Sequence, residues 1–446
     1  MAETRDMTTG APAPMLIRFS IPVLLGSSMD AIYSITNGAI LGQFVNINAF
    51  TAFGVSFYIY WMVWCVQAGM ISGFTYVFAK RFGEGDSHAF GAAAAMSLWV
   101  VLAFGGCLAA AGVLGVYRLL ILMNTPPQIL DYERIYLQIR FAAMPIAFLG
   151  GTANAVFYAA GNSRTPFVSS VISIVINIIL SVFFVLRTPL GITGVALAAA
   201  IAQTAACVFS LVKLRGAGIL HIKKRDLKPD FGVIRPLISI GLPLGVRDLP
   251  SAVVALLVQQ AVNNFGMAYA AGIAAGKQMN NFLFLLGTAV SNAALVYVGQ
   301  NFGAKKYDRV ARGVRIALIM SLICVVITVA ATAPFRLQII SLFIPGGGTA
   351  ADAFAYGVRQ FGLILLIVPA YYFTLLFRAV FNGLGNGFWP MVSGFVEAGV
   401  RVAVVFVLVP LTGQWGLYIA EPAGWPIMAA LLMIVYFWGF RKKIHD

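Results

Sequence analysis

The chain has 446 residues, of which 60% are apolar or aromatic and only 10% are charged, and its formal net charge is +15. Ordinary soluble domains carry about 25% charged residues, so this composition excludes a water-soluble enzyme, and the high hydrophobicity excludes a disordered chain. The apolar runs are long and continuous, as in 168–186 and 317–333, whereas a transmembrane β-barrel would show short alternating segments. The predicted fold class is therefore all-α, a polytopic membrane protein.

Polar breaks and Gly/Pro punctuation divide the chain into twelve predicted spans. A transmembrane helix needs about 20 residues, so twelve of them use about 240 and leave room for loops and tails. In chain order, the spans are expected near residues 15–43, 49–80, 89–118, 133–160, 165–186, 191–214, 234–264, 269–301, 309–343, 353–384, 389–411 and 415–440.

Basic residues concentrate on one side of this predicted topology. With the N-terminus inside, the opposite side holds only Arg118, Arg134, Arg187 and Arg336, and the remaining loop Lys and Arg residues lie inside. Because cytoplasmic loops carry an excess of Lys and Arg, we predict a multi-pass protein of the cell inner (plasma) membrane with both termini cytoplasmic. No soluble domain is available to present a basic face, so we expect no nucleic-acid partner.

The two halves of the chain repeat each other. Gly161-Asn162-x-x-x-Pro166 follows span 4, and Gly385-Asn386-x-x-x-Pro390 follows span 10, at an offset of 224 residues. Six spans per repeat keep corresponding helices in the same direction, which predicts two lobes with pseudo-two-fold symmetry and a central cleft. The predicted division is a cytoplasmic tail at 1–14, an N-lobe at 15–214, a cytoplasmic linker at 215–233, a C-lobe at 234–440 and a cytoplasmic tail at 441–446.

Several short motifs occur in the order seen in one transporter family. They are Ser20-Ile21-Pro22 in span 1, the loop sequence Phe82-Gly83-Glu84-Gly85-Asp86 after span 2, Gly241-Leu242-Pro243 at the start of span 7, and Trp415-Gly416-Leu417 in span 12. With the repeat, they make the chain resemble the multidrug and toxic compound extrusion (MATE) family, part of the multidrug/oligosaccharidyl-lipid/polysaccharide flippase superfamily. The resemblance implies export of small amphipathic molecules, coupled to inward H⁺ or Na⁺, by alternating access of two lobes. It implies no enzymatic activity and no cofactor beyond the coupling ion.

The chain departs from the family at the positions that usually bind the coupling ion. Asn37 stands before Gly42 where many members carry an aspartate, and Ser181 replaces the aspartate that follows Asn177. In the C-lobe, our alignment places Ser251 or Arg247, and Tyr371, where members with C-lobe coupling have carboxylates. Neither carboxylate cluster is intact, so the resemblance leaves H⁺ and Na⁺ both open.

Charges within spans are costly and mark functional sites by default. Asp30, about 15 residues into span 1, is either a cleft carboxylate that binds a cation or a proton, or a structural hydrogen-bond acceptor. Asp248 lies at a similar depth in span 7; it either serves the same role or neutralises Arg247 or Lys277. Lys277 faces either the cleft or a neighbouring carboxylate.

Glu397 and Arg401 are four residues apart in span 11 and are expected to pair on one helix face, as a structural pair more than a substrate contact. Glu421 is expected near the outer end of span 12.

The candidate site residues form two predicted sets. Coupling is assigned to Asp30, Asn37, Asn177 and Asp248; the substrate cleft is assigned to Tyr33, Arg247, Lys277, Asn280, Tyr371, Glu397 and Arg401. The three acidic residues Asp30, Asp248 and Glu397 are balanced by three basic ones. We therefore hypothesise a small-molecule substrate that is neutral, zwitterionic or partly anionic, handled by a monomer in contact with membrane lipids, with no catalytic or metal site.

Three other functions compete with export. A flippase for a lipid or lipid-linked glycan of the same superfamily remains the alternative, because Arg247, Lys277 and Arg401 can supply a basic cleft for a pyrophosphate. An intramembrane prenyltransferase would need an Asp-rich metal motif, which the sequence lacks. A channel is disfavoured by the two-lobe repeat.

Overall fold

The computed structural model describes residues 6–123, 125–220, 222, 224–344 and 351–440, and all regular secondary structure within them is helical. Ten helices are long and apolar enough to cross a membrane, and two helix pairs, bent by 45° and 40°, bring the number to 12 if each pair is one span. The predicted all-α polytopic fold is confirmed, and each predicted span has a helical counterpart.

The contacts divide the described chain into two compact units. Unit 1 contains the N-terminal residues up to Thr9, Ile21–Gly245 and Gly299–Lys305; unit 2 contains Gly10–Ser20, Val246–Val298 and the residues from Lys306 onward. The predicted lobe boundaries at 214 and 234 remain a prediction.

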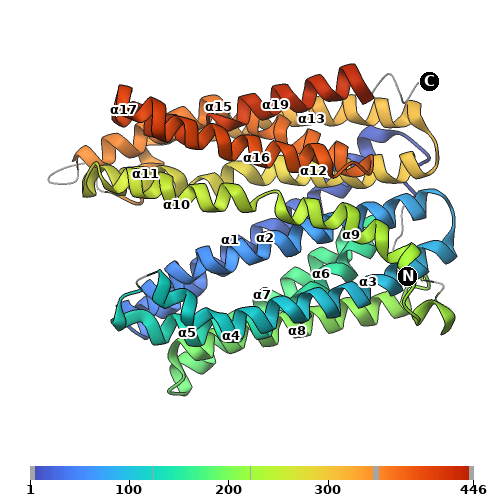
Figure 1. Ribbon diagram of the computed structural model, residues 1–446, viewed down its shortest axis with the longest axis horizontal. Helices are drawn as coiled ribbons and strands as arrows, with labels where there is room; N and C mark the ends of the chain where they lie inside the picture. Colours follow the sequence, from blue (N-terminus) through green and yellow to red (C-terminus); the bar gives the residue numbers. More distant parts are fainter. Residues whose placement is uncertain (1–5, 124, 221, 223, 345–350, 441–446) are drawn as a thin grey trace. The chain divides into compact units, whose positions relative to one another are not determined.

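The elements up to residue 246 belong mainly to unit 1, where α7 lies along α8 and α2 packs on α5 and α6 (Figure 1). They are α1 (Pro12–Phe44), α2 (Ile47–Gly83), α3 (Ser87–Val100), η1 (Val101–Gly105), α4 (Gly106–Leu122), α5 (Pro127–Ala142), α6 (Met144–Ala159), α7 (Arg164–Arg187), α8 (Gly191–Gly216), η2 (Lys224–Leu227) and α9 (Phe231–Val246).

The later elements belong mainly to unit 2, where α15 packs along α11, α13 and α19, and α16 packs on α10 and α19. They are α10 (Leu249–Asn263), α11 (Met267–Gln278), α12 (Asn280–Gly303), α13 (Tyr307–Thr332), α14 (Arg336–Ser341), α15 (Ala351–Gly383), α16 (Phe388–Ala403), η4 (Val404–Leu408), α17 (Val409–Thr412), α18 (Gln414–Ala420), α19 (Gly424–Ile434) and η5 (Val435–Phe440).

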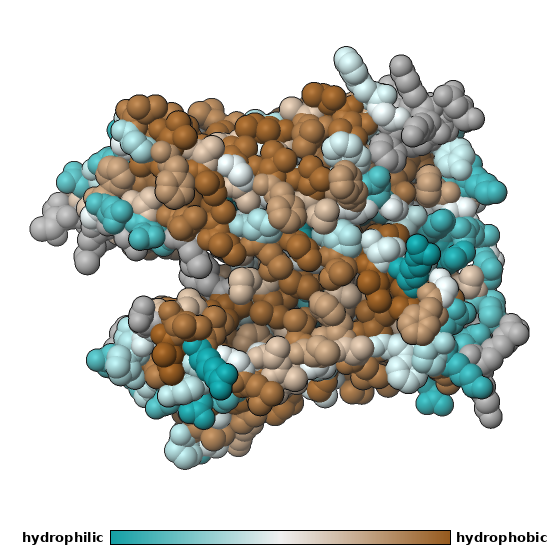
Figure 2. All heavy atoms as spheres, viewed as in Figure 1, coloured by the Kyte–Doolittle hydropathy of each residue, from teal (hydrophilic) through white to brown (hydrophobic). Residues whose placement is uncertain are grey.

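The helices expose large apolar side chains, as membrane spans must. Leu114 is 80% exposed and Phe406 is 64% exposed. On the face shown in Figure 2, hydrophobic residues cover the middle of the helices, and hydrophilic residues gather at their ends. Water would penalise this surface, whereas hydrocarbon does not.

The repeated Gly-Asn motif builds the same turn in both halves. Gly161 and Gly385 each have φ of 76°, a left-handed conformation that glycine adopts without steric cost and that ends α6 and α15. The next residue then caps the following helix: the side chain of Asn162 accepts a hydrogen bond from the backbone N–H of Thr165, and that of Asn386 accepts one from Trp389. The sequence repeat is thus a structural repeat.

Several of the predicted spans consist of two helices with a break between them, and four of these breaks bear on the polar groups described below. The breaks separate α5 from α6 at Ala143, α9 from α10 at Arg247 and Asp248, α11 from α12 at Met279, and α18 from α19 at Glu421–Ala423. Proline stands in the first turn of α6 and α10, where its missing N–H does no harm. Breaks free backbone polar groups and are tolerated in membrane proteins where they line a polar or water-filled region.

Glycine allows α2 and α12 to touch backbone to backbone within unit 1. A Cβ built on Gly83 would collide with the carbonyl group of Gln300, and one on Gly303 would collide with that of Lys80. The Gln300 side chain also accepts a hydrogen bond from the backbone N–H of Met7 (2.7 Å) and donates one to the carbonyl of Ala159 (2.6 Å). The ends of α2, α6 and α12 and the N-terminal segment are therefore joined at one place.

We predict that Gly303→Ala destabilises the protein by about 1–3 kcal/mol, because the added methyl group forces two backbones apart. Gly115→Ala in α4 is the matched control: nothing lies within 4 Å of its added Cβ, so the change stabilises the helix slightly. The measurement is the fraction of monodisperse protein left after heating in detergent. Equal melting of the two variants would contradict the close crossing.

Candidate functional site

Unit 1 holds a buried neutral group where the family's coupling residues are expected. Asn37 of α1 donates from Nδ2 to Oδ1 of Asn177 on α7 (2.9 Å), and Ser181 donates from Oγ to Oδ1 of Asn37 (3.1 Å). All three side chains are buried, and within the described residues Nδ2 of Asn177 has no hydrogen-bond partner. The two predicted coupling residues Asn37 and Asn177 are therefore in direct contact, without a carboxylate in their hydrogen-bonded group.

The other coupling candidate on α1 is Asp30, whose side chain lies outside the described residues. Tyr33, one turn before Asn37, belongs to unit 1, and its ring centroid lies 5.9 Å from the guanidinium carbon of Arg140 on α5.

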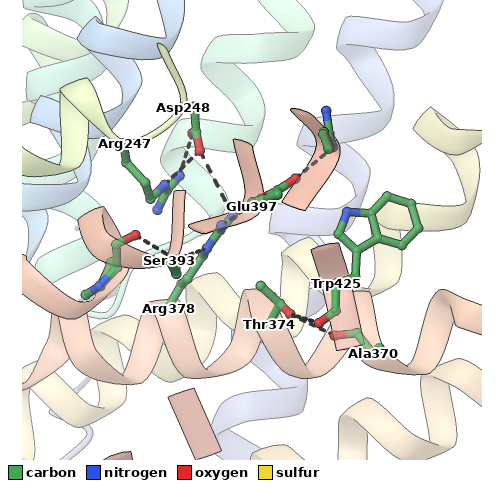
Figure 3. A network of polar contacts seen from close by, with 10 residues as sticks. Arg247, Asp248, Ala370, Thr374, Arg378, Ser393, Glu397 and Trp425 are labelled. Atoms are coloured by element: carbon green, nitrogen blue, oxygen red, sulfur yellow. Dashed lines mark hydrogen bonds and ion pairs between the residues drawn. The ribbon is translucent and has the colours of Figure 1, made fainter. Parts of the chain in front are cut away.

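Unit 2 contains a charge network centred on Glu397 of α16 (Figure 3). Its Oε2 lies 2.9 Å from Nη2 of Arg378 on α15, and its Oε1 lies 2.7 Å from Nη2 of Arg401. The Glu397–Arg401 contact is the pair that their spacing predicts. Arg378 also donates from Nε to the hydroxyl of Ser393 (2.8 Å). The carboxylate is only 8% exposed, so it acts as a shared counterion for two arginines.

Asp248 extends the network at the break between α9 and α10. Arg247 donates to both of its carboxylate oxygens, at 2.9 Å from Nε and 2.7 Å from Nη2, and Nη1 of Arg378 lies 4.0 Å from Oδ1. Of the sequence-based alternatives, Asp248 thus neutralises Arg247 and not Lys277. Its side chain is 28% exposed, which makes it the most accessible carboxylate of the network.

Close backbone approaches bring these charges together. A Cβ on Gly394 of α16 would collide with the carbonyl of Arg247, and one on Gly424 of α19 would lie 2.9 Å from Cγ of Glu397. Glycine at these positions therefore lets α16 lie against both the α9–α10 break and the start of α19.

A second ion pair joins two helix breaks of unit 2. Nζ of Lys277, at the end of α11, lies 3.0 Å from Oε2 of Glu421, which follows α18. Asn280, at the start of α12, donates to Oε1 of the same carboxylate (3.3 Å). Of the two predicted environments for Lys277, the structure shows the neighbouring carboxylate, and Glu421 is its partner.

Aromatic side chains of α12, α15 and α19 contact one another. The Tyr371 ring lies 3.8 Å from that of Phe284 and 4.7 Å from that of Trp425, centroid to centroid. Thr374 donates to the carbonyls of Ala370 and Trp425 (Figure 3). Tyr371 therefore belongs to an aromatic cluster with Phe284 and Trp425.

Sequence reasoning missed two arginines that the structure makes central. Arg378 bridges Glu397 and Asp248, and Arg140 is buried among tyrosines of unit 1. Each stands inside a predicted span, at 353–384 and at 133–160, and the rule that intramembrane charges are functional suspects would have singled them out. The ion-paired groups of these two sites in unit 2 comprise three carboxylates and four cations, an excess of one cation. They are Asp248, Glu397 and Glu421 with Arg247, Lys277, Arg378 and Arg401.

The chemistry available in these groups is ion binding and ion-pair exchange. Among the described residues, no group of three or more His, Cys, Asp or Glu side chains is placed to hold a metal ion. The carboxylates face arginine and lysine, which leaves them able to exchange a cationic partner for a proton or another cation.

The MatE family model matches residues 22–183 and 243–407, and the chain belongs to this family of multidrug efflux transporters. It is 24% identical over 436 residues to the probable multidrug resistance protein YoeA of Bacillus subtilis, covering 95% of this chain and 93% of that protein. It is 20% identical over 434 residues to the multidrug export protein MepA of Staphylococcus aureus (strain NCTC 8325 / PS 47), covering 94% and 93%.

Solved structures share the fold over almost the whole chain. The outward-facing conformation of a multidrug resistance MATE family transporter of the MOP superfamily matches with a TM-score of 0.91 and 19% identity, covering 99% of this chain and 97% of that one. A mutant of the Vibrio cholerae transporter VcmN matches with a TM-score of 0.89 and 20% identity, covering 97% of both chains. A second, shorter family match, to the lipid II flippase MurJ, spans residues 141–228.

We predict that Glu397→Gln destabilises the protein by about 3–5 kcal/mol, because it leaves two buried arginines without their counterion. Glu84→Gln is the control: Glu84 pairs with Arg81 at 2.9 Å, but that arginine side chain is 43% exposed, and such pairs contribute less than about 1 kcal/mol. Thermal melting in detergent measures both. The double change Glu397→Gln with Arg378→Gln should recover part of the loss; a single variant as stable as wild type would refute the counterion role.

Proposed function

We propose that the chain exports small amphipathic molecules by antiport with H⁺ or Na⁺, through alternating access of two lobes. The observation that carries this is the MatE match to both halves of the chain, together with ion-paired carboxylates inside predicted spans of unit 2. We place the protein in the plasma membrane as a monomer with both termini cytoplasmic, as the asymmetry of its basic loops predicts, and in contact with membrane lipids.

Asp248 is the proposed entry point for a coupling proton. It is the most exposed carboxylate of the network, and Arg247 and Arg378 are its basic neighbours. A proton on Asp248 would remove the charge that holds Arg247 in a two-point contact. The freed arginine would then favour a different arrangement of the α9–α10 break, and this difference in stability between two states is what couples an ion to a conformational change.

Sodium coupling would use a different group of atoms. The carbonyl oxygens of Asn37 and Asn177 each accept one hydrogen bond and keep a second lone pair. Neutral oxygens can ligate Na⁺ but cannot take up a proton near neutral pH. We therefore assign a coupling proton to Asp248 and a coupling Na⁺ to Asn37 and Asn177. Transport driven by a pH gradient or by a Na⁺ gradient, each imposed alone, distinguishes the two coupling ions.

We expect a pH gradient, and not a Na⁺ gradient, to drive efflux of a fluorescent amphipathic probe from proteoliposomes. Asp248→Asn should lower pH-driven efflux at least about tenfold, because the amide cannot be protonated under these conditions. Asp131→Asn, which changes an exposed carboxylate on α5, is the control and should transport at the wild-type rate. Wild-type efflux by Asp248→Asn would remove Asp248 from coupling, and efflux driven by Na⁺ alone would reject the proton.

Asp30 is the second proposed coupling residue, on the basis of its position about 15 residues into the first predicted span. We expect Asp30→Asn to abolish pH-driven efflux while the protein still reaches the membrane in normal amount. Unchanged driven efflux in this variant would assign coupling to unit 2 alone.

A lipid or lipid-linked glycan flippase is the second candidate, because the lipid II flippase model matches residues 141–228. Reconstituted protein that moves a fluorescent lipid between leaflets, but not the soluble amphipathic probe, would favour this function over export.

A further inference from the structure

Arg140 is a buried arginine with no ion-pair partner in the part of the chain that the structure describes. Its side chain is 5% exposed, and its Nε and Nη1 atoms have no hydrogen-bond partner among the described residues. Among the described side chains, no carboxylate lies within ion-pair distance of its guanidinium. This contrasts with the network arginines of unit 2, each of which contacts a carboxylate.

Three tyrosines of unit 1 surround this arginine. The guanidinium carbon lies 4.3 Å from the ring centroid of Tyr60 on α2 and 5.9 Å from that of Tyr33 on α1. Tyr136, one turn earlier on α5, is buried beside them. The hydroxyl of Tyr33 is also buried, and the described part of the chain offers it no hydrogen-bond partner. We call Arg140, Tyr33, Tyr60 and Tyr136 the arginine–tyrosine cluster.

The position of the cluster on the helices places it at a polar break. Arg140 lies in the last turn of α5, just before the 45° bend to α6. Tyr33 is one turn before Asn37 on α1, so the cluster adjoins the neutral group of Asn37, Asn177 and Ser181.

The atoms of this cluster that lack hydrogen-bond partners among the described residues can all donate, so they require an acceptor. Nε and Nη1 are donors only, the Tyr33 hydroxyl can donate, and a cation buried without a counterion is expensive. Ring faces compensate part of the charge but accept no strong hydrogen bond. An oxyanion supplies both the negative charge and the acceptors, and the planar guanidinium fork suits carboxylate or phosphate oxygens.

We propose that the arginine–tyrosine cluster is a binding subsite for the oxyanion, a carboxylate above all, of an amphipathic transported molecule, with the tyrosine rings contacting its aromatic body. The proposal rests on the export function and names its substrate class: zwitterionic or anionic aromatic amphiphiles rather than simple hydrophobic cations. The amides of Asn37 and Asn177 beside the cluster are neutral.

The test compares two dyes that differ only at the carboxyl group: rhodamine 110, the free acid, and rhodamine 123, its methyl ester. Purified full-length protein in an uncharged detergent is titrated, and binding is measured by fluorescence anisotropy. Wild type should bind the free acid at least about tenfold more tightly than the ester. Arg140→Gln should abolish this preference by weakening the free acid alone, since a charge-assisted hydrogen bond is lost.

Further variants separate binding from folding. Arg134→Gln is the matched control, because Arg134 lies on the same helix and over a tyrosine ring (Tyr117, 5.2 Å) but is exposed; it should keep the wild-type preference. Tyr33→Phe keeps the ring and removes one donor, so it should reduce the preference several-fold. Should Arg140→Gln fail to fold, Arg140→Lys, which keeps the charge but loses the fork, should still lower the preference.

Three results would overturn the proposal. The first two are equal affinity of wild type for both dyes and an unchanged preference in folded Arg140→Gln. The third is displacement of the free acid by anionic phospholipid in nanodiscs, which would assign the cluster to a lipid phosphate. Binding in detergent needs no ion gradient, so these results are independent of transport. Gradient-driven efflux without tighter binding of the free acid would reject the subsite and support the export function. Tighter binding of the free acid without gradient-driven efflux would support the subsite and reject the export function.

Discussion

A charge inside a membrane span must be compensated, and the sharing of Glu397 between Arg378 and Arg401 is how unit 2 meets this requirement. The arrangement of α15, α16 and the α9–α10 break follows from it. Gly394 and Gly424 allow the close backbone approaches that the pairing needs, and Ser393 takes up the remaining Nε donor of Arg378. Removing the carboxylate would leave Arg378 and Arg401 without the counterion that they share.

The helix breaks and the charges occur at the same places. Arg247 and Asp248 stand between α9 and α10, Lys277 ends α11, and Glu421 follows α18. A break frees backbone polar groups that the hydrocarbon cannot satisfy, and charged side chains need a polar surrounding, so each requirement supports the other. The 45° bend beside Arg140 follows the same rule in unit 1.

The two units solve the charge problem in opposite ways. In unit 2, carboxylates and basic side chains pair within 2.7–3.0 Å. In unit 1, amides and a serine stand at the expected carboxylate positions, and among the described side chains the arginine of the neighbouring cluster contacts tyrosines and no carboxylate. A chain of the MatE family can thus keep the fold, with TM-scores of 0.91 and 0.89 to solved transporters, while the chemistry of its polar groups differs between units. That difference is what connects the proposed coupling to unit 2 and the proposed oxyanion subsite to unit 1.

The sequence by itself determined the all-α membrane fold, its spans, the two Gly-Asn turns and the Glu397–Arg401 pair, because hydropathy, glycine conformation and helix spacing act over a few residues. It also indicated that Asn37 and Asn177 belong together, because both occupy positions at which the family usually binds its coupling ion. It did not reveal the partners of Arg378 and Lys277 or the isolation of Arg140. Arg378 meets Glu397 across 19 residues and Asn280 meets Glu421 across 141; such contacts depend on which helix faces pack together. Only the tertiary structure decides that, because many packings bury the same apolar surface and few compensate every charge.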